Sequence, residues 1–88
     1  MKQINLYITE SLNKETYYVI KVISGKWKDS YVYADAEYWK DTQDINHASK
    51  GKSLNDIKKE KSAFEKETKN NFGEAVIIQV DVTYKEIK

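Results

Sequence analysis

The most constraining feature of the chain is the run AVIIQVDVTY at residues 75–84, where apolar side chains occupy every second position. Successive side chains of a β-strand point to opposite sides of a sheet, so this period of two predicts a strand with one buried face and one solvated face. We expect the apolar set to face the core: Val76, Ile78, Val80, Val82 and Tyr84. The opposite face then carries Gln79, Asp81 and Thr83.

Three earlier segments are predicted to supply partner strands. Alternating or dense β-branched and aromatic residues predict strands at residues 3–9, 16–23 and 27–36. Residues 11–14 read as a polar turn, and the glycine of residues 24–26 suits a hairpin turn. Between residues 35 and 52 the periodicity fails. We expect one helical turn begun by Asp35 and then loop, with a short edge strand at residues 45–48 as the alternative.

One helix is predicted from Ser53 to about Asn70. Ser53 followed by Asp56 is a variant of the capping box, in which the serine hydroxyl accepts from a free amide of the first turn. Gly73 is placed to end the helix in a left-handed conformation. At about 100° per residue, one narrow apolar stripe forms, with Lys61 and Thr68 inside it. Its apolar members are Leu54, Ile57, Phe64 and Phe72.

These elements predict one α+β domain over residues 1–88, with the order β-β-β-α-β in a four-stranded, mostly antiparallel sheet. A single helix covers only one face of such a sheet. The uncovered face is expected to carry Gln79, Asp81 and Thr83 together with Asn5, Tyr7, Tyr17, Tyr31 and Tyr33.

Composition excludes several classes of function. The net charge of +1 predicts neither general affinity for nucleic acid nor an acidic mimic of it. No run approaches a membrane span of about 20 apolar residues, and no apolar segment has the length found in a signal peptide, so we expect a soluble, cytoplasmic protein. The chain has no cysteine, and the single histidine, His47, makes a poor metal site. Its three glycines match no phosphate loop, and no nucleophile has an adjacent base. We therefore expect no metal, no cofactor and no enzymatic activity.

The tyrosines of the uncovered sheet face form the first candidate surface. Tyrosine gives large, rigid contact area with little rotamer entropy to lose, which suits a protein interface. Tyr17, Tyr31 and Tyr33 are the candidate residues. The alternative is that they only cover the sheet, because aromatic residues have high β-propensity.

An acidic-aromatic segment forms the second candidate surface. Tyr38 and Trp39 are surrounded by four carboxylates, with only Lys40 opposing them, and the carboxylates are Asp35, Glu37, Asp41 and Asp44. A tryptophan in a loop is a typical binding hot spot, and the carboxylates suit a basic partner surface. The alternative is that both rings fold back onto the core and the carboxylates are solvated.

A lysine quadrant of the predicted helix is the third candidate, and it consists of Lys58, Lys59, Lys66 and Lys69. These side chains suit contacts with phosphates. All 15 basic residues are lysine, so the bidentate arginine–guanine contact is unavailable, and the quadrant supports non-specific binding at most. A charged outer helix face is otherwise simply solvated.

The layout YYVIKVISGKW…KSLNDIKKEK…AVIIQVDVTY, with its small size and its bias to lysine, asparagine and tyrosine, resembles small accessory proteins of phages and mobile elements in low-GC Gram-positive bacteria. Anti-CRISPR inhibitors are the best-known group of these. The resemblance implies a stoichiometric inhibitor that blocks a nucleic-acid-processing host protein such as a nuclease. It assigns no residue a role, and the +1 charge departs from the strongly acidic members.

The sequence thus favours a non-enzymatic module that docks on another protein through the tyrosine face and the segment around Trp39. Two alternatives stay open. One is a nucleic-acid-binding accessory protein that uses the lysine quadrant. The other is a self-associating structural protein, a homodimer in which two uncovered sheet faces bury each other.

Overall fold

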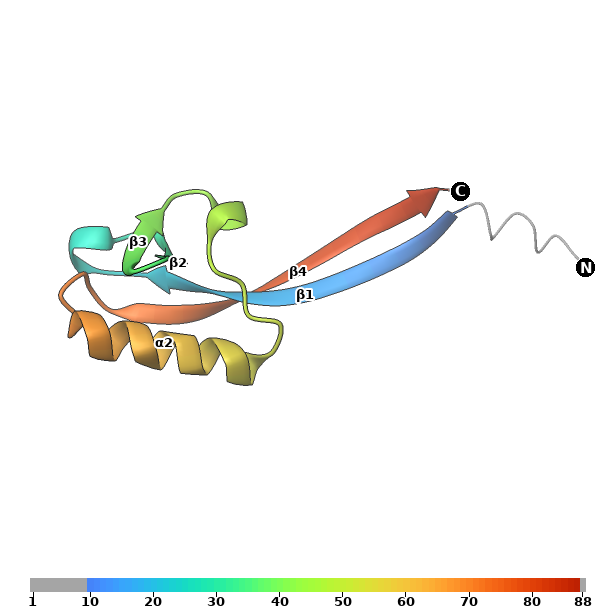
Figure 1. The fold of residues 1–88 in the computed structure, drawn as a ribbon. Coiled ribbons are helices and arrows are strands. Elements are labelled where there is room, and N and C mark those ends of the chain that lie inside the picture. The colour runs from blue at the N-terminus through green and yellow to red at the C-terminus, as the bar shows by residue number, and fades with distance from the viewer. Residues whose placement is uncertain (1–9, 88) are drawn as a thin grey trace, which may run out of the picture.

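The computed structural model describes residues 10–87, and side chains over residues 14–85. One helix, α2 (Leu54–Thr68), packs against a four-stranded antiparallel sheet with strand order β3-β2-β1-β4 (Figure 1). The strands are β1 (Glu10–Val22), β2 (Tyr31–Asp35), β3 (Tyr38–Thr42) and β4 (Ala75–Ile87). Two 3-10 helices lie at Gly25–Trp27 and Ile45–His47. The predicted α+β class and the order β-β-β-α-β are confirmed for the described residues.

Several predicted boundaries were wrong. The strand expected at residues 3–9 lies outside the described residues. Residues 11–14 belong to β1 and are no turn, because they pair with residues 83–86 of β4. The helical turn expected to begin at Asp35 is absent from the described structure, because residues 38–42 form β3 in a hairpin with β2. The alternative edge strand at 45–48 is a 3-10 helix over Ile45–His47. The backbone pairing of these segments outweighs their weak side-chain periodicity.

Helix α2 begins as predicted and ends differently. The Ser53 hydroxyl accepts a hydrogen bond from the Asp56 amide at 3.1 Å, which confirms the cap. At the other end Lys69 adopts the left-handed conformation at φ 54°, so the helix ends at Thr68, five residues before Gly73. Gly73 (φ 126°) serves the close approach of two chain segments, since a Cβ there would lie 1.7 Å from the Ser24 carbonyl oxygen.

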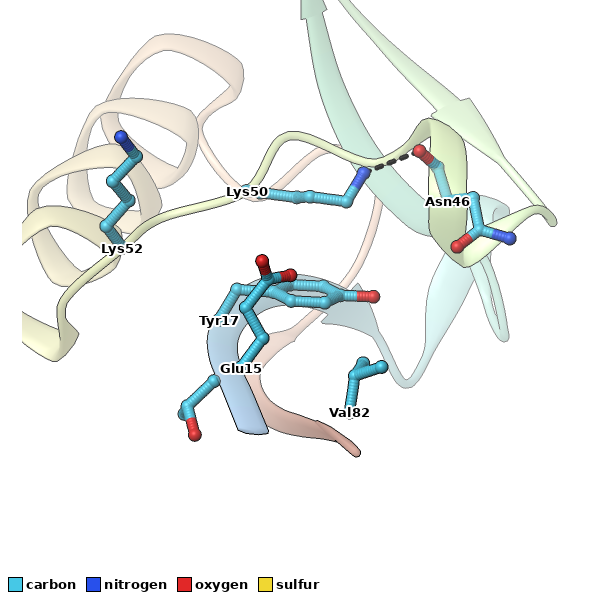
Figure 2. Close-up of a pocket in the computed structure, with 7 residues that line it drawn as sticks. Glu15, Tyr17, Asn46, Lys50, Lys52 and Val82 are labelled. Carbon is cyan, nitrogen blue, oxygen red and sulfur yellow. Dashed lines mark hydrogen bonds between the residues drawn. The ribbon is translucent and has the colours of Figure 1, made fainter. Parts of the chain in front are cut away.

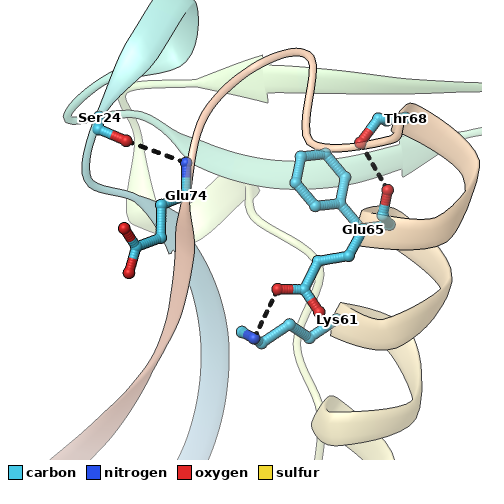
Figure 3. Close-up of polar contacts among 6 residues, drawn as sticks. Ser24, Lys61, Glu65, Thr68 and Glu74 are labelled. Atoms are coloured by element: carbon cyan, nitrogen blue, oxygen red, sulfur yellow. Dashed lines mark hydrogen bonds and ion pairs between the residues drawn. The ribbon is translucent and has the colours of Figure 1, made fainter.

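Figure 3 shows two polar contacts within α2 and one contact that joins Ser24, after β1, to Glu74, before β4. The Thr68 hydroxyl donates to the Phe64 carbonyl at 2.6 Å, which explains how a threonine is buried within the apolar stripe. Lys61 forms an ion pair with Glu65 at 2.8 Å, so its ammonium reaches the edge of the stripe. The Glu74 amide donates to the Ser24 hydroxyl at 3.1 Å and fixes the start of β4 beside the end of β1.

The core lies between α2 and one face of the sheet. Its fully buried side chains include Ile57 and Phe64 from α2, against Ile20 and Val22 from β1. Phe72 lies beyond the helix and stacks on Trp27 with ring centroids 3.9 Å apart. Leu54, expected in the stripe, is 44% exposed, because it is the first residue of the helix and extends past the core.

The register of β1 and β4 reverses the two faces that we expected for β4. Val22 lies opposite Ala75 and Ile20 opposite Ile77, and all four belong to or pack on the helix-side core. Opposite residues share a face, so the even-numbered residues of β4 lie on the face away from α2. The apolar set is therefore not under the helix, and Val82 is exposed. Residues 75–78 are apolar at both odd and even positions, so the pattern there fits either face.

The β1–β4 ribbon continues well past the N-terminal end of α2 (Figure 1). We call residues 10–16 of β1 with residues 81–87 of β4 the arm, and residues 17–22 with 75–80 the helix-backed part. The radius of gyration is 17.7 Å, and the molecule measures 61 × 23 × 22 Å. A compact domain of this length has a radius of gyration of about 12 Å. The extended arm contributes to this difference.

Strand β2 diverges from β1 after a short pairing, and residues 49–51 enter the space between them. Gly51 exchanges two hydrogen bonds of 2.9 Å with Tyr18 of β1. Ser49 bonds β2 instead, since its amide donates to the Val32 carbonyl and its hydroxyl accepts from the Ala34 amide. This segment links the β2–β3 hairpin to the start of α2.

Among the described residues, no helix combines the length and the apolar character needed to span a membrane.

Candidate functional site

The face of the sheet opposite α2, which we call the outer face, gathers the candidate side chains. Val32 is in the helix-side core, so its neighbours Tyr31 and Tyr33 point to the outer face. Tyr17 lies on the same face, opposite Val80. The structure therefore brings the three predicted tyrosines to one face. Gln79, Asp81 and Thr83 lie on the helix side of the ribbon, contrary to expectation.

These three tyrosines already have neighbours within the chain. The Lys50 ammonium lies 5.6 Å from the ring centroid of Tyr17, and the Lys21 ammonium 5.8 Å from that of Tyr31. The rings of Tyr33 and His47 meet edge to face at 4.5 Å. The rings are half-buried in consequence. Their free surface is smaller than the sequence suggests.

The acidic-aromatic segment is divided by β3. Because successive residues of a strand alternate, Tyr38 points to the outer face and Trp39 to the helix side. Tyr38 is 68% exposed. The Trp39 ring meets Phe64 edge to face at 5.4 Å, and its indole nitrogen donates to Glu67 at 2.8 Å. Trp39 therefore packs on the core, as in the alternative interpretation of this segment.

The carboxylates of this segment do not form one patch. Asp35 pairs with Lys40 at 2.8 Å, and this hydrogen bond and charge lower the pKa of Asp35 and raise that of Lys40. Asp44 accepts from the Asn46 amide at 2.9 Å and caps the 3-10 helix at Ile45–His47. Asp41 is on the helix side with Trp39, and Glu37 is in the β2–β3 turn.

A groove of about 610 Å³ lies where the arm joins the helix-backed part, beneath residues 46–52 (Figure 2). Tyr17 and Val82 provide its apolar surface. Figure 2 shows the Lys50 side chain extended above the Tyr17 ring, where its ammonium donates to the Asn46 carbonyl. The remaining lining residues are Glu15, Thr16 and Lys52. The groove is therefore apolar at its centre and charged at its rim.

Sequence reasoning missed the groove and the arm. Val82 and Tyr84 were assigned to the core by their period, although a strand longer than the helix that covers it must leave its far end bare. Lys50 and Lys52, the lysines at the groove, precede the helix cap, and no sequence pattern sets them apart from the other lysines. A comparison of the predicted strand length with the predicted helix length could have indicated the arm.

The lysine quadrant lies on the solvent side of α2. All four side chains are exposed: Lys58, Lys59, Lys66 and Lys69. The described residues contain no cluster of three or more histidine and acidic side chains suited to hold a metal ion.

Comparison with known proteins gives no relative for this chain: no family model, no curated protein and no solved structure matches it.

Proposed function

We propose that the protein is a non-enzymatic module that docks on another protein through its outer face. One observation carries this proposal: large, strongly exposed apolar side chains gather on that face at both of its ends. Tyr38 is 68% exposed at the hairpin end, and Tyr84 and Val82 are 47% and 36% exposed on the arm. The groove lies between these two ends.

The chemistry of this face fits a protein partner. Exposed tyrosines and an apolar groove with a mixed-charge rim are typical of protein interfaces, where a buried aromatic centre is surrounded by polar groups. Tyr38, Val82 and Tyr84 are the proposed anchors, and Lys50 and Glu15 orient the partner at the groove. Trp39 is not among the contacts that we propose, because its ring packs against Phe64.

A matched pair of variants tests the docking face. A partner captured from host lysate by the wild-type protein should bind Tyr38→Ala at least about tenfold more weakly, the loss expected for a moderate hot spot. Lys59→Ala, on the exposed face of α2, should bind like the wild type. Both variants should keep the wild-type melting temperature. Unchanged affinity of Tyr38→Ala and of Val82→Ser would contradict the proposal.

The narrower form of the proposal is a stoichiometric inhibitor of a host nuclease, supported by the resemblance to phage accessory proteins. Titration of the captured partner's nuclease activity should then reach a plateau at an equimolar ratio. Full nuclease activity at excess inhibitor would remove the narrower form and leave the docking face in place.

Binding of nucleic acid through α2 is the rival function, and the exposure of all four lysines favours it. Its mark is an affinity that falls steeply with salt, in proportion to the number of phosphates contacted. An electrophoretic shift at low salt that is lost in a Lys58→Ala, Lys59→Ala double variant would support this function over the docking face.

A further inference from the structure

No described strand pairs with the outer edge of β4 along the arm. Strand β4 ends the sheet order, so its only strand neighbour among the described residues is β1. Tyr18 exchanges its backbone bonds with Gly51, on the side of β1 away from β4. Residue pairs of an antiparallel ladder alternate between hydrogen-bonded and non-hydrogen-bonded, and Tyr18 with Gln79 is therefore a non-hydrogen-bonded pair. The amide and carbonyl of Gln79 thus point outward, away from β1. The same alternation turns the backbone groups of Asp81 and Thr83 outward.

This edge lacks several of the usual protections against pairing, although it carries the charges of Asp81 and Lys85. Natural edge strands are short, or carry prolines, bulges or inward charges. Here β4 is 13 residues long, the chain has no proline, and β1 and β4 pair without a bulge over residues 10–22 and 75–87. A two-stranded ribbon without further cover is also only marginally stable, and a third strand would stabilise it.

We propose that a second copy of this chain pairs antiparallel along this edge, with the twofold axis at Val82. Val82 then lies opposite Val82 of the second copy, and Val80 opposite Tyr84 of the second copy. These β-branched and β-branched–aromatic pairs lie on the outer face and are the kind that stabilises sheets. On the helix side, Asp81 lies opposite Thr83 of the second copy, and these two exchange backbone hydrogen bonds.

Neighbouring registers are less favourable. Only outward-pointing residues exchange bonds, so the axis must coincide with a residue of β4. An axis at Asp81 sets two carboxylates against each other, which destabilises a strand pair. An axis at Thr83 shortens the part of β4 that can pair from residues 77–87 to residues 79–87. An axis at Val80 pairs the arm with the helix-backed part of the second copy, so the two arms no longer support each other.

This arrangement leaves the rest of each molecule in place. A twofold axis perpendicular to the sheet keeps both α2 helices on one side and joins two four-stranded sheets edge to edge. The two outer faces become continuous, and the pairing uses an edge, so it does not occupy the groove. Val82 and Tyr84 contribute both to the dimer and to the proposed docking face, whereas Tyr38 contributes to the docking face alone, so Tyr38→Ala distinguishes a loss of docking from a loss of the dimer.

The charge of the arm favours a second copy over nucleic acid. Among its described side chains, Lys14 and Lys85 are balanced by Glu15 and Asp81. Such a ribbon has no excess positive charge for phosphates. The balanced charge of the arm suits pairing with the arm of a second copy.

A single cysteine tests the register. The chain has no cysteine of its own, so Val82→Cys introduces one thiol. Opposite residues of a non-bonded antiparallel pair have Cα atoms about 4.5 Å apart, within the range of a disulfide. Mild oxidation should therefore convert most of the variant to a disulfide-linked dimer that reductant reverses. Val80→Cys is the matched control on the same face, since its two copies lie more than about 13 Å apart in this register.

Mass measurements test the dimer itself. Light scattering should give a mass that rises from 10.3 kDa toward twice that value with concentration. The Thr83 amide points away from β1 and makes no hydrogen bond in the β1–β4 ribbon. Thr83→Pro removes this amide, so it should weaken the dimer at least about tenfold and leave the fold of the monomer intact. A wild-type monomer at about 1 mM, or equal cross-linking of Val80→Cys and Val82→Cys, would overturn the proposal. The proposal would also be overturned if the protein stayed monomeric and its β4 edge paired only with a strand of another protein.

Discussion

Strands β1 and β4 run through two environments within one ribbon. In the helix-backed part, Val22 and Ile20 are fully buried against Phe64 and Ile57. In the arm the same pairing continues, yet Val82 and Tyr84 remain exposed. The difference shows that strand pairing determines which residues share a face, and that the length of α2 determines which of them are buried.

The largest effect should come from removing the ring on which the helix-backed part depends. Phe64→Ala deletes a fully buried side chain that meets Trp27 and Trp39, so it should cost about 3–5 kcal/mol of unfolding free energy. Leu54→Ala, on the same helix and 44% exposed, should cost less than about 1 kcal/mol. Urea denaturation of both measures the difference, and equal costs would show that α2 does not cover the core as described.

One substitution made in each region compares them directly. Val22→Ala removes two methyl groups from a fully buried site and should cost about 2–3 kcal/mol. Val82→Ala makes the same change on the arm, where the side chain is 36% exposed, and should cost less than about 1 kcal/mol. Denaturation at low protein concentration is the measurement. A larger loss at Val82 would mean that the arm is covered in the monomer.

Two backbone substitutions of opposite expected sign test where the chain leaves α2 and turns into β4. Gly73→Ala places a Cβ against the Ser24 carbonyl at a φ of 126°, so it should cost more than about 1 kcal/mol. Lys69→Gly, at the left-handed end of α2, should instead leave stability unchanged or raise it by up to about 1 kcal/mol. Thermal melts of the two variants that shift in the same direction would contradict these backbone assignments.

The smallest effect should be a pH dependence carried by the ribbon. Hydrogen bonds from Thr16 and Gln79 lower the pKa of Asp81 below its ordinary value of 3.8. A lowered pKa stabilises the folded state above pH 3.8, and this contribution is lost as the pH falls through the folded-state pKa. Asp81→Asn should therefore flatten the acid side of the stability curve slightly. Identical pH profiles of variant and wild type between pH 2 and 5 would show that these bonds contribute nothing.

Much of the fold could be predicted from local signals. The cap of α2 at Ser53, the strand 75–84 and the burial of Ile57 and Phe64 follow from hydrogen-bonding chemistry and periodicity. The face of β4 that meets α2 could not be predicted, because residues 75–78 are apolar at both odd and even positions. Strand β3 was missed because its stability comes from pairing with β2, which involves no side-chain pattern.

The candidate site was predictable only in part. The outward direction of Tyr31 and Tyr33 followed from their alternation with Val32. The opposite directions of Tyr38 and Trp39 did not, because a helical turn and then loop were expected after Asp35. The groove depends on residues 46–52 crossing beside Tyr17, a tertiary arrangement that the local sequence does not encode.

Amide hydrogen exchange of the monomer tests most directly the division of the ribbon into a covered and an uncovered part. The amides of Ile78 and Tyr84 both point toward β1, one in the helix-backed part and one in the arm. In dilute Thr83→Pro protein, Ile78 should exchange only with global unfolding. Tyr84 should exchange through local opening, with an opening free energy at least about 2 kcal/mol lower. Equal opening free energies for the two amides would contradict the account.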